Sequence, residues 1–159
     1  MNIAFFLLPK KDVVYLKTDS TMRQALERME YHLYSTVPLI DDDGKYVGVL
    51  TEGDLLSKMK NTPGLTFMNT EKIYLDEIKR HTQYNPVSVN TQMENLIVRA
   101  AEQNFIPVVD DNGIFIGIIC RSELIRYSVD CINPSHNFTL TKIKDLFSGN
   151  SAMRSLCLS

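Results

Sequence analysis

Hydrophobic and polar positions follow two patterns along the chain, and each pattern occurs twice. Apolar side chains at helical spacing predict an amphipathic helix near residue 22 and another near residue 93. Each helix precedes two short β-prone runs and a further helical segment, at about 52–60 and 121–131. The first stripe comprises Met22, Ala25, Leu26, Met29 and Leu33, and the second Met93, Leu96, Ile97, Ala100 and Ala101.

The β-prone runs are an internal repeat. Residues 37–50 match residues 106–119 in type at every position except Lys45, which stands against Ile114. Each copy opens with a proline that suits the first position of a strand, continues through an acidic turn with glycine, and ends in a second strand. Pro38 and Pro107 are 69 residues apart. Each copy therefore predicts a β-hairpin.

The repeat predicts an organisation in five parts. These are a lead-in at 1–11, a first repeat at 12–62, a linker with a second lead-in at 63–85, a second repeat at 86–132, and a C-terminal helix and tail at 133–159. Each repeat reads β-α-β-β-α, which is an α/β fold of the α+β type. A unit of about 60 residues has a marginal core of its own. We therefore expect the two repeats to pack through their sheets as a pseudo-twofold pair.

Composition narrows the class of partner. The 159 residues are 44% hydrophobic and 23% charged, with a formal charge of −2. This balance argues against a broad electrostatic nucleic-acid interface. No apolar run approaches the length of a membrane span, and the apolar stretch at 3–8 is too short for a secretory signal. We expect a cytoplasmic protein with neither a nucleic-acid nor a membrane partner.

Catalytic and metal motifs are absent from the sequence. It contains no GxGxxG, GxxxxGK[ST], GxSxG or HExxH pattern, and its cysteines lack CxxC spacing. The acidic turn at 41–44 is not a calcium loop, because its sixth residue is Tyr46 rather than glycine. His32, His81 and His136 are scattered, which is more typical of surface or capping residues than of a catalytic base. We expect no enzyme activity, no catalytic residue and no metal site.

One constellation combines a structural and a chemical interpretation. Thr51 and Asp54 stand three residues apart where a strand runs into a helix. They suit an N-cap and the third helical position. The same helix terminus can also bind phosphate, and a carboxylate can accept two hydrogen bonds from a ribose cis-diol. The two interpretations are not exclusive, so Thr51 and Asp54 are candidate nucleoside-binding residues.

These features resemble the cystathionine β-synthase (CBS) domain, and two copies in tandem resemble a Bateman module. The resemblance covers about residues 12–132. The shared motifs are a hydrophobic-Pro-hydrophobic-hydrophobic-Asp strand, an Asp/Asn-Gly turn, a glycine-containing second strand and Thr-x-x-Asp. In the first repeat they fall on Ala25, Leu26, Met29, Val37, Pro38, Asp41, Gly44, Gly48, Thr51 and Asp54.

The resemblance implies a sensor of AMP, ADP, ATP, S-adenosylmethionine or cyclic di-AMP, which binds in clefts between the repeats. In the family, Thr51 and Asp54 correspond to the pair that holds phosphate and ribose. The adenine pocket corresponds to Val14, Tyr15, Ser35, Thr36, Val37 and Pro38, with Ile106 and Pro107 as second-repeat equivalents. The module would signal to an effector protein and form a homodimer. No cofactor beyond this regulatory ligand is implied.

The second repeat departs from the motif. Cys120 and Glu123 replace the threonine and the aspartate, and a thiol is a weaker phosphate partner than a hydroxyl. Glu123 is one methylene longer than aspartate and remains a candidate ribose ligand. Arg121 is either a bidentate phosphate ligand or a solvated residue at the helix start. The chain is similar to stand-alone cyclic di-AMP-binding CBS proteins of Gram-positive bacteria. The alternative is a structural adaptor whose degenerate clefts bind no nucleotide.

Overall fold

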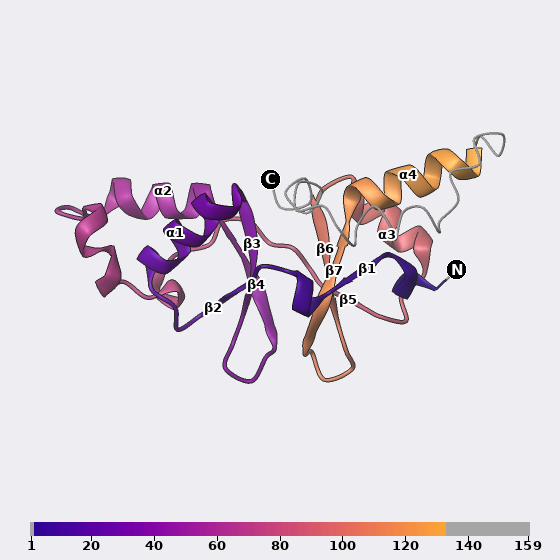
Figure 1. Ribbon diagram of the computed structural model, residues 1–159, viewed down its shortest axis with the longest axis horizontal. Coiled ribbons are helices and arrows are strands. Elements are labelled where there is room, and N and C mark those ends of the chain that lie inside the picture. Colours follow the sequence, from indigo (N-terminus) through magenta and orange to yellow (C-terminus); the bar gives the residue numbers. More distant parts are fainter. Residues whose placement is uncertain (1, 133–159) are drawn as a thin grey trace.

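The computed structural model describes residues 2–132 (Figure 1). The expected C-terminal helix and tail at 133–159 lie outside the described residues. The strands are β1 (Leu7–Pro9), β2 (Leu16–Lys17), β3 (Thr36–Ile40), β4 (Tyr46–Thr51), β5 (Val87–Ser88), β6 (Phe105–Val109) and β7 (Phe115–Cys120). The α-helices are α1 (Met22–His32), α2 (Glu52–Asn61), α3 (Met93–Ala100) and α4 (Arg121–Ile132), and short 3₁₀ helices span Ile3–Phe6, Lys10–Asp12, Phe67–Lys72 and Leu75–Glu77.

The first repeat forms a three-stranded sheet in the order β2-β3-β4. Helix α1 begins with a capping box between Thr21 and Gln24, and its apolar stripe buries Met22, Ala25 and Met29. Strand β3 is buried along its whole length, parallel to β2 and antiparallel to β4. The hairpin and the two helices agree with the sequence prediction, except that Leu33 of the predicted stripe follows α1 as its C-cap and is 75% exposed.

The second repeat reproduces this arrangement. Strands β5, β6 and β7 pair as β2, β3 and β4 do, with a register shift at the same place in each hairpin. Strands β2 and β5 each contain two residues, which is shorter than the extended runs that the sequence indicates. Between the repeats, the expected lead-in element consists of the two 3₁₀ helices Phe67–Lys72 and Leu75–Glu77.

The two repeats meet at their hairpin turns, which lie side by side in Figure 1. The Tyr46 N–H donates to the Gly113 carbonyl at 3.1 Å, and the Phe115 N–H donates to the Gly44 carbonyl at 3.0 Å. Tyr46 and Phe115 are equivalent positions of the repeat, and their rings stack at 6.1 Å. These reciprocal contacts confirm the pseudo-twofold pairing of the sheets.

The core crosses from one repeat to the other. Phe105, Phe115 and Ile118 of the second repeat lie in the same buried cluster as Leu39 and Leu50 of the first. Burying these side chains against one another removes apolar surface that a single repeat would expose to water, which is the main favourable contribution to folding. The two repeats therefore share one core, and none of the helices within residues 2–132 has the length and apolar character needed to cross a bilayer.

The outer edges of the two sheets differ. The N-terminal strand β1 pairs antiparallel with β7, which completes a four-stranded sheet in the order β1-β7-β6-β5. In Figure 1, β1 accordingly lies beside the second repeat although it opens the chain. The corresponding edge of the first sheet, along β4, has no paired strand among residues 2–132. There the chain between the repeats passes β4 without forming regular secondary structure.

Candidate functional site

Thr51 and Asp54 form a capping box at the start of α2. The Asp54 N–H donates to Thr51 Oγ1 at 3.1 Å, and the Thr51 N–H donates to Asp54 Oδ2 at 3.0 Å. The two bonds satisfy backbone donors that the first turn of a helix leaves unpaired. The predicted structural role of both residues is present. The Thr51 hydroxyl accepts in this contact, so its own hydrogen remains a potential donor.

Asp54 is also held by a residue outside its helix. Asp54 Oδ1 accepts one hydrogen bond from the His81 backbone N–H at 3.0 Å, and it lies 2.9 Å from His81 Nδ1. The Asp54 side chain is 1% exposed and the His81 side chain 51% exposed. Burial alone would raise the Asp54 pKa, but the hydrogen bonds from His81 and Thr51 outweigh it and lower that pKa below its ordinary value. The site therefore contains a shielded, ionised carboxylate.

A cavity of about 330 Å³ adjoins this carboxylate. It lies between α2 and the segment that leads into the second repeat; Lys58 and Lys79 give it a cationic side, and His81 also lines it. The remaining lining residues are Asp54, Ser57, Asn61, Thr62 and Glu77. Within residues 2–132, no group of three or more His, Cys, Asp or Glu side chains could hold a metal ion.

Strand β3 brings two further candidates beside Thr51. Thr36 is the cross-strand partner of Thr51, and the Ser35 carbonyl accepts from the Glu52 N–H at 2.9 Å. Val37 and Pro38 follow within β3 and are buried in the sheet. Ser35 and Thr36 thus lie at the end of the sheet where α2 begins.

Val14 and Tyr15 lie elsewhere in the first repeat. Both pack against the shared core, and the Tyr15 ring contacts Phe115 at 6.3 Å. Phe115 also stacks on Tyr46, which begins β4, whereas Thr51 ends that strand. Six extended residues span about 17 Å. The structure therefore places the Tyr15 ring toward the second repeat, at the other end of β4 from Thr51.

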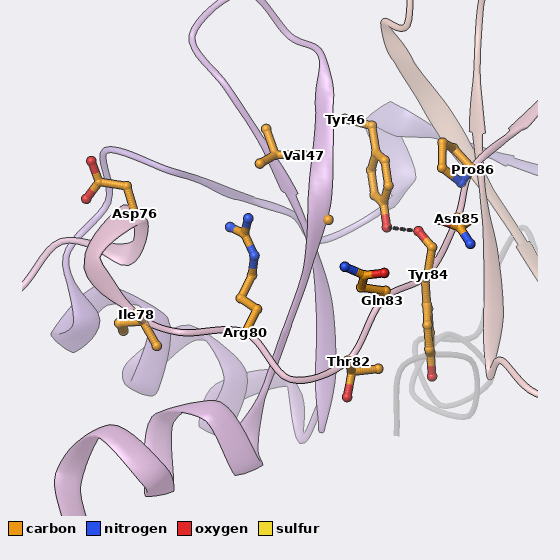
Figure 2. Close-up of a pocket in the computed structure, with 11 residues that line it drawn as sticks. Tyr46, Val47, Asp76, Ile78, Arg80, Thr82, Gln83, Tyr84, Asn85 and Pro86 are labelled. Carbon is orange, nitrogen blue, oxygen red and sulfur yellow. Dashed lines mark hydrogen bonds between the residues drawn. The ribbon is translucent and has the colours of Figure 1, made fainter. Parts of the chain in front are cut away.

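A second cleft, of about 420 Å³, lies on the other side of the segment formed by residues 79–84 (Figure 2). Arg80, Thr82 and Tyr84 line it, whereas Lys79 and His81 line the cavity beside Asp54, so the segment alternates its side chains between the two. The Tyr46 hydroxyl donates to the Tyr84 carbonyl at 2.7 Å, the dashed contact of Figure 2. Burial raises the Tyr46 pKa above its ordinary value, although the nearby Arg80 charge opposes this rise.

The equivalent position in the second repeat has different chemistry. Glu123 is buried near the start of α4, and its Oε1 lies 3.3 Å from Arg126 Nη1. Burial raises the Glu123 pKa despite the Arg126 charge. Arg121 begins α4 and its N–H donates to the Asn104 carbonyl at 3.0 Å. Cys120 lacks the hydroxyl that Thr51 provides.

Ile106 and Pro107 are buried in β6, as Val37 and Pro38 are in β3. Among the candidates, the structure gathers Thr51, Asp54, Ser35 and Thr36 at one helix start. Sequence reasoning interpreted His81 as a surface or capping residue and missed its contact with Asp54. Spacing alone offered no signal for it, because 27 residues separate it from Asp54.

Comparisons with known proteins identify the family. The CBS domain model matches residues 7–61 and 77–130. A CBS domain-containing protein of Dictyostelium discoideum is 25% identical over 141 residues, which cover 84% of this chain and 97% of that protein. The crystal structure of CbpB in complex with c-di-AMP has a TM-score of 0.75 at 19% identity, covering 87% of this chain and 91% of that one.

A third comparison extends the likeness to a structure with a different ligand. The crystal structure of CBSX2 in complex with AMP has a TM-score of 0.64 at 24% identity, and the likeness covers 83% of this chain and 98% of that one. The paired repeats, their shared topology and the two matched segments all agree. This chain belongs to the CBS domain family and contains two CBS domains in tandem.

Proposed function

We propose that this chain is a non-catalytic regulatory module that binds an adenine nucleotide beside Thr51 and Asp54. The observation that carries the proposal is the buried carboxylate of Asp54, whose pKa is lowered at the start of α2. An ionised carboxylate accepts hydrogen bonds only, so it suits the two adjacent hydroxyls of a ribose. Keeping such a group buried is costly unless it has partners.

The surroundings suit the phosphate of the same ligand. The Thr51 hydroxyl has a hydrogen to donate, and the helix start favours negative charge. Lys58 and Lys79 line the adjoining cavity. A nucleotide with its ribose at Asp54 would direct its phosphate toward these donors. The candidate ligands are AMP, ADP and ATP, which present both ribose hydroxyls, and cyclic di-AMP, whose 3′ oxygens are esterified so that each ribose offers Asp54 only its 2′ hydroxyl.

Two structures similar to this chain carry ligands of this class. CbpB was crystallised with c-di-AMP and CBSX2 with AMP. Their low identity to this chain limits the comparison to the fold. They support the proposal because each ligand is an adenine nucleotide held by the same paired architecture.

The output of the module would pass to another protein. A groove of about 800 Å³ over α1 and α2 is lined mostly by apolar side chains, among them Leu33, Leu56 and Phe67. Leu33 and Leu56 are 75% and 70% exposed. Exposed apolar surface of this kind is typical of an interface. We propose that a second copy of the chain covers it, so that the signalling form is a homodimer.

The second candidate function is an adaptor that binds no nucleotide. The observation that favours it is Glu123, because a buried carboxyl with a raised pKa beside Arg126 is a poor diol acceptor. Cys120 and Arg121 complete a start of α4 without the Thr-x-x-Asp pair. If the start of α2 bound no nucleotide, as this proposal supposes for the start of α4, the chain would serve only as a scaffold.

The test is calorimetry of the full chain with AMP, ATP and cyclic di-AMP, together with mass spectrometry of any small molecule that copurifies. We expect one of these nucleotides to bind, and a concentration of 100 times Kd to add about 2.7 kcal/mol to the free energy of unfolding. Asp54→Asn should weaken binding by about 1–3 kcal/mol, with Glu123→Gln as the matched control. Absence of binding by every nucleotide would favour the adaptor.

A further inference from the structure

His81 occupies the oxygen of Asp54 that a ribose would need. Both contacts of Oδ1 come from His81, at 3.0 Å from its backbone N–H and at 2.9 Å from Nδ1. The other oxygen, Oδ2, accepts from the Thr51 N–H. A carboxylate accepts about four hydrogen bonds in all. His81 also covers the carboxylate, since Asp54 is 1% exposed and His81 is 51% exposed. A diol therefore reaches Oδ1 only if His81 withdraws.

The segment that carries His81 is weakly attached. Within residues 2–132, Lys79 to Gln83 form no helix or strand, and no backbone–backbone hydrogen bond is made by them. The next anchor along the chain is Tyr84, whose carbonyl accepts from the Tyr46 hydroxyl. Exposed segments with few backbone hydrogen bonds open at low free energy. His81 is therefore the main polar attachment of this segment to the first repeat.

Displacement of His81 would also change the cleft on the other side of the segment, which Arg80 lines. Its neighbour Arg80 faces the opposite cleft, where a Cβ placed on Gly48 would lie 3.6 Å from Arg80 Nε. Figure 2 shows Arg80 in this cleft, beside Val47 and Asp76. Because the two residues are adjacent in an extended stretch, a backbone shift at His81 moves Arg80 as well. The two cavities are coupled through four residues, 79–82.

We propose that His81 is a latch that competes with the ribose for Asp54. Nucleotide binding transfers Oδ1 from His81 to the diol, releases residues 79–82 and alters the cleft around Arg80. This inference rests on the proposed function and adds its regulation. The free energy of nucleotide binding is the gain from the ribose contacts minus the loss of the His81 contacts. Removing the His81 side chain therefore tightens binding.

The test compares His81→Ala with His81→Asn in the full chain. Alanine removes the Nδ1 contact and keeps the backbone one, whereas asparagine retains an amide donor close to the position of Nδ1. We expect His81→Ala to bind AMP about two- to tenfold tighter than the natural sequence, which is the worth of one hydrogen bond. His81→Asn should stay close to the natural sequence. The 2′,3′-dideoxy analogue of AMP, which lacks the diol, should show no such gain.

A second measurement follows the latch directly. Hydrogen exchange at the His81 amide should speed up when AMP binds the natural chain, because that N–H loses its acceptor. Equal or weaker AMP binding by His81→Ala, or an amide that stays protected in the complex, would overturn the latch while leaving nucleotide binding intact. If neither His81→Ala nor the natural chain binds AMP, ADP, ATP or cyclic di-AMP, the proposed function itself fails, and the latch fails with it.

Discussion

The starts of α2 and α4 are equivalent positions of one repeat, yet the pKa values of their acidic residues are shifted in opposite directions. At α2, hydrogen bonds from His81 and Thr51 lower the pKa of Asp54. At α4, burial raises the pKa of Glu123, with Arg126 as the opposing charge. The backbone arrangement around the two starts is shared, since Glu52 and Arg121 each donate to the carbonyl before the neighbouring strand. Duplicated backbones thus keep their geometry while a few side chains set the direction of the pKa shift at each helix start.

The outer edges of the two sheets also differ, in what lies next to an equivalent glycine of β7 and β4. Gly117 of β7 lies against the carbonyl of Leu8 in β1, so closely that a Cβ there would collide with that oxygen. At the equivalent Gly48, the nearest atoms belong to the Arg80 side chain. One glycine makes room for a strand, and the other for a movable side chain.

The largest loss of stability should come from adding a side chain at Gly117 or at Gly48. Gly117→Ala should lower the free energy of unfolding by about 3 kcal/mol, from a strained φ together with overlap against β1. Gly48→Ala carries a similar φ strain, because φ is 153° at Gly48 and 158° at Gly117. It should cost about 1–2 kcal/mol, since Arg80 can move aside. Chemical denaturation of both variants measures the difference, and equal losses would show that the approach of β1 contributes nothing.

A smaller and sign-dependent effect should separate the two acidic residues. Asp54→Asn should destabilise the chain at neutral pH by about 2 kcal/mol, because Thr51 and His81 lose an ionised acceptor. Glu123→Gln should instead stabilise it by about 0.5–1 kcal/mol, because a buried charge is removed. Thermal unfolding at pH 7 tests both, and two changes of the same sign would contradict the comparison.

The pH dependence of the free energy of unfolding follows from the pKa shifts of Asp54 and Glu123. A lowered folded pKa at Asp54 gives stability that is present at neutral pH and is lost as the pH falls through that pKa. A raised folded pKa at Glu123 gives stability that is present in acid and is lost as the pH rises through that pKa. Asp54→Asn should therefore flatten the acid side of the stability profile, and Glu123→Gln should remove the loss on raising the pH.

The last prediction concerns the stacked pair at the hairpins. Tyr46→Phe gives the first repeat the residue that the second repeat has at the equivalent position, Phe115. It removes the hydrogen bond to the Tyr84 carbonyl and should cost about 1 kcal/mol. Phe115→Tyr is the reciprocal change, and its hydroxyl would enter a buried site. Urea unfolding of the Tyr46→Phe chain provides the measurement, and unchanged stability would mean that this bond adds nothing net.

Local pattern was enough to predict the repeat, its hairpins and its helices. Pro38, the Gly44 turn and the apolar stripe of α1 are signals within a few residues of one another, and the structure agrees with them. The placement of β1 beside β7 was not predictable, because that pairing joins residues more than 100 positions apart. Pattern within one segment contains no information about which distant segment lies beside it.

The residues of the candidate site also differ in whether the sequence could predict their contacts. Thr51 and Asp54 could be proposed from a spacing of three residues, and their capping contacts are present. His81 could not, because its contact with Asp54 depends on the path of the chain between the repeats. Tyr15 was grouped with Thr51 by family resemblance, whereas its ring packs toward Phe115. Sequence thus predicted the contacts that depend on local geometry and missed the contact that depends on the connection between the repeats.

The crossed backbone bonds between the hairpin turns also restrict how the halves of the molecule can move. Gly44 and Gly113 each accept from the opposite repeat, so a motion that preserves both bonds must rotate about that point. Displacement then grows with distance from this pivot. The starts of α2 and α4 lie at the far ends of β4 and β7, so a rotation about the hairpin turns displaces them more than it displaces the turns. The helices that follow these strands would therefore change their relative position while the contacts at the turns stay in place.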